Sequence, residues 1–150
     1  MTNVALPDLD GTCNCLAARK AARYLTAAYD RALAPSGLRI TQFTILYKLA
    51  RLGPMTIKRL AAAMAMDRTT LAANLKPLER DGHLVTGTAE DRRAKTIEIT
   101  ATGKAALESA VPLWTIAQSQ FETGYGATAA FGLRFALRGV LETGLDPWAE

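Results

Sequence analysis

Residues 55–85, MTIKRLAAAMAMDRTTLAANLKPLERDGHLV, hold two short amphipathic segments separated by one polar break. Thr56 is placed to cap a helix over residues 57–64, and Asp67 to cap a second helix that runs from Arg68 to about Asp81. At a cap position a side-chain oxygen accepts a bond from an otherwise unpaired first-turn N–H group. The apolar face of the second helix is a row of leucines at i, i+4 and i+7: Leu71, Leu75 and Leu78.

The end of the second helix leads into a predicted β-hairpin. Gly82 is expected to cap this helix, and Pro77 to bend or tighten its last turn. Residues 84–88 and 93–99 have the composition of strands, because apolar and polar residues alternate in the second of them. Residues 89–92 are the expected tip of the hairpin.

Helical spacing of apolar residues predicts further helices on both sides of this centre. The expected features are a helix over 13–33, a helix capped by Thr41 and ended by Gly53-Pro54, a helix from Thr100 to about Glu122 with a kink at Pro112, a turn at Gly124-Tyr125-Gly126, and a helix from Ala127 to about Thr143. The fold class is therefore mainly α with a small β-hairpin wing. The outer helices carry more apolar surface than one small domain can cover, which predicts that they pack against a second copy.

The expected organisation is one domain. Residues 1–12 form a flexible lead and residues 13–150 a single unit, with a winged helix-turn-helix over about 40–100 and dimerisation helices over about 13–34 and 101–144. The chain has no membrane-spanning apolar run and no signal-peptide pattern, so we expect a cytoplasmic protein with no membrane partner.

The charge of the chain is unevenly distributed. The formal net charge is +4, with ten Lys or Arg against six Asp or Glu in residues 51–104 and two against five in residues 105–150. The basic middle would attract a polyanion.

Two short helices joined by a tight turn, with polar and basic residues on the second, indicate a helix-turn-helix. The second helix would enter a DNA major groove about 12 Å wide and contact base edges with its N-terminal half. Lys58 would contact a phosphate. The predicted DNA contacts are Thr56, Lys58, Arg68, Thr69, Thr70, Asn74, Lys76, Arg92, Arg93 and Lys95.

The hairpin tip supplies the second predicted contact. Arg92 and Arg93, with Lys95, concentrate positive charge on a projecting ribbon that can enter a minor groove. Asp91 would support this wing by orienting one arginine through a bidentate pair.

The chain resembles the MarR family, the multiple-antibiotic-resistance-type regulators, from about Cys15 to Leu141. The resemblance rests on Thr41-Gln42-Phe43, on the run from Met66 to Leu71, on Leu78-Glu79-Arg80-Asp81-Gly82, on Asp91-Arg92-Arg93-Ala94-Lys95 and on Ile99-Thr100-Ala101-Thr102-Gly103. It implies a triangular homodimer that reads a pseudo-palindromic operator on double-stranded DNA. It also implies a repressor that is released by a small aromatic ligand or by thiol oxidation.

This sequence departs from the family pattern in its recognition helix. Family members often carry Ser or Thr and Arg where Ala72 and Ala73 stand here, and the loop from Val85 to Asp91 is shorter than usual. The alternative function is therefore a helical dimer that binds a small molecule or a protein and has weakened DNA affinity.

Two sets of residues are candidates for sensing a signal. Cys13 and Cys15 lie at an expected helix N-terminus, where the helix dipole favours the reactive thiolate; the alternative is that they are two inert small residues. Tyr24, Tyr47 and Trp114 could line a ligand pocket, or could simply be core. No cofactor or metal is expected, because two cysteines and one histidine do not make a four-ligand site. With no nucleophile elbow or phosphate-cradling loop either, an enzyme is excluded.

Overall fold

The computed structural model of this chain describes residues 4–88 and 95–149. Its elements, in chain order, are α1 (Leu9–Thr12), α2 (Asn14–Leu33), the 3-10 turn η1 (Ala34–Ser36), α3 (Ile40–Leu52), β1 (Met55–Thr56), α4 (Ile57–Met64), α5 (Arg68–Arg80), β2 (Leu84–Thr88), β3 (Lys95–Ile99), α6 (Ala101–Tyr125) and α7 (Ala127–Val140). Within these ranges no helix is both long enough and apolar enough to cross a bilayer.

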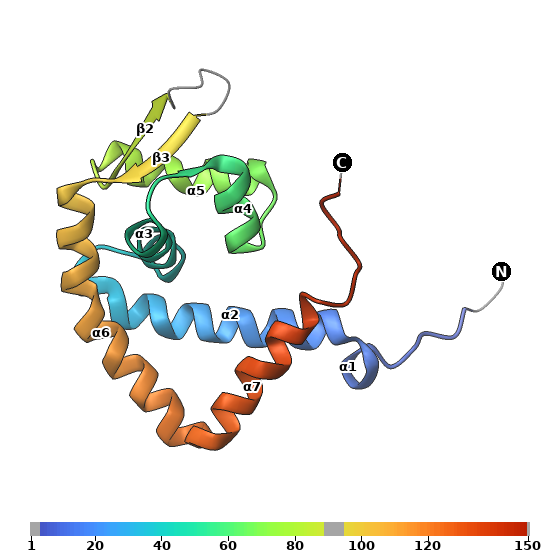
Figure 1. Cartoon of the computed structure of the whole chain (residues 1–150). Coiled ribbons are helices and arrows are strands. Elements are labelled where there is room, and N and C mark those ends of the chain that lie inside the picture. Colours follow the sequence, from blue (N-terminus) through green and yellow to red (C-terminus); the bar gives the residue numbers. More distant parts are fainter. Residues whose placement is uncertain (1–3, 89–94, 150) are drawn as a thin grey trace.

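The elements form two parts that meet along α3. Figure 1 shows α4, α5 and the β2–β3 hairpin on one side of α3, which together we call the winged unit, residues 40–100. On the other side lie α2, α6 and α7, which we call the arm. The predicted fold class, mainly helical with a small β wing, is confirmed.

The core of the winged unit is built around α3, which supplies three of its most deeply buried side chains. The largest fully buried side chains of the described chain are Leu33, Ile45, Leu46, Leu49, Leu60, Leu71, Leu78, Leu84 and Ile97. They come from α2, α3, α4, α5 and both long strands, so one continuous core fixes α5 against the rest of the unit.

The sheet has three strands rather than the two expected. All its strands are antiparallel in the order β1-β3-β2, with Met55 opposite Ile97 and Leu84 opposite Ile99. Ile97 and Ile99 are buried and Glu98 is exposed, which confirms the predicted alternation. Strand β1 is only two residues long, so it leaves no alternating pattern in the sequence and is defined only by its pairing with β3.

Thr100 ties the base of the wing to the end of α5. Its hydroxyl donates to the Gly82 carbonyl at 2.6 Å and accepts from the Gly103 N–H group at 3.0 Å. Its backbone N–H group donates to the His83 carbonyl at 3.1 Å. The first turn of α6 is therefore joined to the segment that connects α5 to β2.

The prediction that Thr41 caps α3 is wrong, because Arg39 holds the cap position. The side chain of Gln42 accepts from the Arg39 N–H group at 2.9 Å, and the Asp30 carboxylate accepts from the Ile40 N–H group at 2.7 Å. Asp30 lies on α2, so a tertiary contact, rather than a local side chain, decides where α3 begins.

Two further expectations are corrected at helix ends, and a short helix is found in the N-terminal lead. Helix α6 runs through Tyr125, so the predicted turn at Gly124-Tyr125-Gly126 reduces to Gly126 alone, whose φ is 99°. The C-cap of α5 is Asp81, and Gly82 follows it with φ 77°. The short helix α1, which Asp8 caps, lies in the N-terminal lead.

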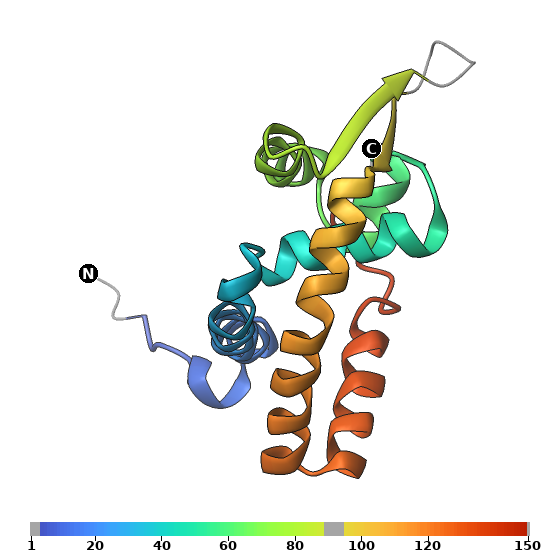
Figure 2. The same ribbon diagram turned by 90° about the vertical axis from the view of Figure 1, so that its left-hand side faces the viewer.

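The arm leaves most of the apolar side chains of α7 without partners. Helix α6 packs on α2, and Figure 2 shows α7 returning beside α6. Ala130 is the one buried residue of α7, whereas Phe131 is 64% exposed and Phe135 is 71% exposed. This apolar surface is the surplus that the sequence predicted for the outer helices.

Candidate nucleic-acid interface

The two caps of the helix-turn-helix form as predicted. The Thr56 hydroxyl accepts from the Arg59 N–H group at 3.2 Å at the start of α4. The Asp67 carboxylate accepts from the Thr70 N–H group at 2.9 Å at the start of α5. Hydrogen bonds from the Thr70 side chain and backbone hold the pKa of Asp67 below its ordinary value. Asp67 thus stays ionised at the positive end of the α5 dipole.

Helix α5 presents one apolar and one polar face. Leu71, Leu75 and Leu78 are buried, whereas Thr69, Ala73 and Lys76 share an exposed face at i, i+4 and i+7. Arg68 is also exposed and opens the helix. This arrangement has the polarity that a helix entering a DNA groove requires, because its leucines anchor it and its outer face is free of large apolar groups.

Three of the predicted contacts already have local partners. The Thr56 hydroxyl and the Thr70 N–H group belong to the caps, and the Asn74 amide donates to the Thr70 carbonyl at 2.8 Å. Asn74 would have to give up that bond to offer both of its amide groups to an adenine edge. Lys58, Thr69, Lys76 and Lys95 are all exposed.

The wing is described only up to its tip. Lys95 opens β3 and is exposed, opposite Thr88 of β2. The predicted contacts Arg92 and Arg93 and their predicted support Asp91 lie outside the described residues. Of the three cations that the wing was predicted to bring to DNA, only Lys95 therefore lies in the described part of the chain.

Two of the three predicted pocket residues are brought together. Tyr47 and Trp114 line one cavity of about 460 Å³ with Phe43, whose ring stacks on Trp114 at a centroid distance of 6.4 Å. This cavity lies where α3 of the winged unit meets α6 of the arm. Tyr24 does not line it and is 76% exposed.

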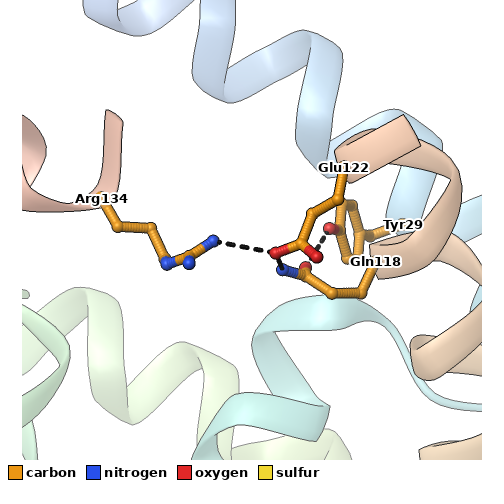
Figure 3. Close-up of polar contacts among 4 residues, drawn as sticks. All are labelled: Tyr29, Gln118, Glu122 and Arg134. Atoms are coloured by element: carbon orange, nitrogen blue, oxygen red, sulfur yellow. Dashed lines mark hydrogen bonds and ion pairs between the residues drawn. The ribbon is translucent and has the colours of Figure 1, made fainter. Parts of the chain in front are cut away.

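A polar cluster in the arm was missed by the sequence analysis (Figure 3). The Tyr29 hydroxyl donates to Gln118 at 2.6 Å, Gln118 donates to Glu122 at 3.2 Å, and Arg134 pairs with the same Glu122 oxygen at 3.2 Å. Burial, and then the Glu122 carboxylate, raise the pKa of Tyr29 above its ordinary value. The cluster joins α2, α6 and α7, and only its Gln118–Glu122 spacing of four residues is visible in the sequence.

The two cysteines occupy different positions at the start of α2. Cys13 is the N-cap, and its sulfur accepts from the Leu16 N–H group at 3.4 Å. Cys15 is exposed, and both are free thiols. Within the described ranges, no group of three or more His, Cys, Asp or Glu residues is placed to hold a metal ion.

Comparison with known proteins places this geometry in a family. Residues 36–94 match the model for the MarR family. The chain is 39% identical to the transcriptional regulator MosR of M. tuberculosis, whose crystal structure is in complex with DNA; the match covers 89% of this chain and 100% of that chain, with a TM-score of 0.77.

Two other similarities are more limited. The transcriptional repressor CouR, bound to a 23-mer DNA duplex, is 22% identical with a TM-score of 0.79, and the match covers 93% of this chain and 99% of that one, which shows likeness of fold. YwoH of Bacillus subtilis, an HTH-type transcriptional regulator, is 31% identical over 81 residues, which are 54% of this chain and 59% of that protein. The chain thus spans little more than half the length of the curated relatives it matches.

Proposed function

Because the chain belongs to the MarR family of DNA-binding winged helix-turn-helix transcriptional regulators, we propose that it is a homodimeric repressor of a specific operator. The observation that carries the proposal is the exposed polar face of α5, held in place by a leucine face and a charged cap. In the dimer, two such helices would enter successive major grooves about 34 Å apart. A protein with this role would work in the cytoplasm, where its operator is.

DNA binding through this face should depend steeply on salt. Each phosphate neutralised by a lysine or arginine releases counterions, which gives a slope of about −0.9 per phosphate in a plot of log K against log salt. Fluorescence anisotropy with a labelled duplex from the DNA flanking its own gene measures this slope. Equal affinity for a shuffled duplex would show that the protein does not recognise a specific operator sequence. No binding at any salt concentration would favour the alternative, a ligand- or protein-binding dimer.

The unpartnered apolar surface of α7 supports the homodimer. Phe131, Phe135 and Val140 are each more than half exposed, and a two-fold partner would cover them. We expect Phe135→Glu to convert the dimer to a monomer, because each copy would have to bury a carboxylate in the interface.

Sedimentation velocity measures this change. The matched control is Leu52→Glu, since Leu52 is 59% exposed at the end of α3, outside the arm. A Phe135→Glu protein that sediments as the wild type does would show that α7 is not in the interface, and a wild-type monomer would contradict the dimer itself.

The signal that releases the repressor is either thiol oxidation or a small aromatic ligand. A disulfide between Cys13 and Cys15 would take the capping sulfur from the Leu16 N–H group and distort the first turn of α2. The cavity at Tyr47 and Trp114 is of a size for a single aromatic ring and lies between the arm and the winged unit. Either event would change the angle between the two reading helices of the dimer.

Mild peroxide separates these two signals. If the thiols are the sensor, peroxide should release the operator from the wild-type protein, dithiothreitol should restore binding, and Cys13→Ser should abolish the response. Mass spectrometry of the treated protein reports the adduct or disulfide. Unmodified thiols together with unchanged DNA affinity would end the redox proposal and leave the aromatic ligand.

A further inference from the structure

We propose that the segment after α7, residues 141–149, is a built-in competitor for the DNA surface at the first turns of α4 and α5. The inference rests on the proposed function, since it concerns the same interface. It adds that the chain itself limits access to that interface.

The segment turns back from the arm to the winged unit. In Figure 1 it leaves the end of α7 and rises on the side of the molecule where α4 lies. Two residues with positive φ, Gly144 at 80° and Asp146 at 41°, give it this bent path. Asp is one of the few residues with a side chain that adopts this conformation readily. The bend is therefore encoded in the sequence of the segment.

The segment and helices α4 and α5 line one open cavity of about 600 Å³. The wall on the winged unit is formed by Lys58, Ala61, Ala62, Met66, Asp67 and Arg68, and the opposite wall by Asp146, Trp148 and Ala149. Lys58 and Arg68 are two of the predicted DNA contacts. Both cations are exposed, but a cavity of this size has no room for a duplex, so a duplex approaching them from this side would meet the segment.

The charges at this cavity also argue that DNA and the segment cannot occupy it together. Lys58 lies in the first turn of α4 and Arg68 opens α5, so both cations stand where helix N–H groups and dipoles also favour an anion. Asp146 lines the same cavity, so a DNA phosphate bound to these cations would stand near its negative charge. Since two anions repel each other there, DNA and the segment exclude one another.

Trp148 is the one large apolar residue that the segment contributes to the cavity. It is 52% exposed, so half of its surface is covered, and it shares the cavity with Ala61, Ala62 and Met66. A half-exposed tryptophan holds a segment only weakly, so DNA can displace it. When only a fraction of molecules is open to a ligand, the apparent dissociation constant is the intrinsic one divided by that fraction. We expect the segment to weaken DNA binding by about threefold to tenfold on this basis.

The experiment compares the full chain with a chain that ends at Thr143, and with Asp146→Asn and Trp148→Ala. Asn also accepts a positive φ, so Asp146→Asn removes the charge without changing the bend. The matched control is Glu142→Gln, which removes one negative charge from the same segment at a residue that does not line the cavity. Anisotropy titrations at several salt concentrations give each dissociation constant, and sedimentation confirms that each variant has the oligomeric state of the wild type.

The shortened chain should bind its operator about threefold to tenfold more tightly, with smaller gains for Asp146→Asn and Trp148→Ala and no more than a marginal gain for Glu142→Gln. A shortened chain that binds no more tightly than the full chain would overturn the inference while leaving the proposed function intact. Equal gains for Asp146→Asn and Glu142→Gln would also overturn it, because net charge would then explain the effect. If none of these proteins binds DNA, the proposed function fails, and this inference fails with it.

Discussion

Replacing Ala73 by Glu should weaken DNA binding at least thirtyfold and leave the folded structure unchanged. Ala73 lies between Thr69 and Lys76 on the exposed face of α5, opposite the buried leucines. In the proposed complex a carboxylate at this position would face base edges and phosphates. It would lose its hydration shell and gain no hydrogen-bond or ion-pair partner from the DNA. A misplaced buried charge at an interface costs about 2 kcal/mol or more, which corresponds to roughly thirtyfold in the dissociation constant.

The same substitution should not disturb the protein alone. Glu is a good helix former, and at position 73 it stands three residues before Lys76, with which it can pair. Anisotropy titration measures the affinity, and thermal denaturation checks the fold. The control is Ala50→Glu, which adds the same charge at an exposed position on α3. If the Ala73→Glu protein bound its operator as the Ala50→Glu protein does, the outer face of α5 would not be the reading surface.

The elements that local chemistry determines were predictable from the sequence. The caps Thr56 and Asp67 were predicted because the acceptor and the N–H group it accepts from are three residues apart in the chain. The leucine face of α5 was predicted because helical periodicity records burial directly. These features are also what place the candidate interface, which is why most of its helical residues could be named in advance.

The features that were missed depend on contacts between segments far apart in the chain. Asp30 fixes the start of α3 from ten residues away, and Tyr29 reaches Gln118 across 89 residues. Strand β1 exists because β3 lies beside it, and Asp146 lines the same cavity as Lys58 only because two positive φ values bend the chain. Periodicity and capping rules act over about one helical turn, so none of these contacts leaves a local signal.

The second large effect is expected at Gly103, in the first turn of α6. A Cβ atom added there would stand 2.0 Å from the His83 carbonyl oxygen and 2.8 Å from the side chain of Ile99. The carbonyl is backbone and is held by the N–H group of Thr100, so it cannot move aside alone. We therefore expect Gly103→Ala to lower the free energy of unfolding by about 2–3 kcal/mol, as overpacking does when the neighbours are rigid.

The matched control is another glycine of the same helix. Gly124 has no atom within 4 Å of an added Cβ, so Gly124→Ala should stabilise the chain by roughly 0.5–1 kcal/mol through helix propensity alone. Urea denaturation followed by circular dichroism measures both changes. Since the Gly103 contact joins α6 to the base of the wing, Gly103→Ala should also weaken operator binding. If Gly103→Ala were as stabilising as Gly124→Ala, α6 would not pack against the His83 carbonyl, and the wing would not be positioned through this contact.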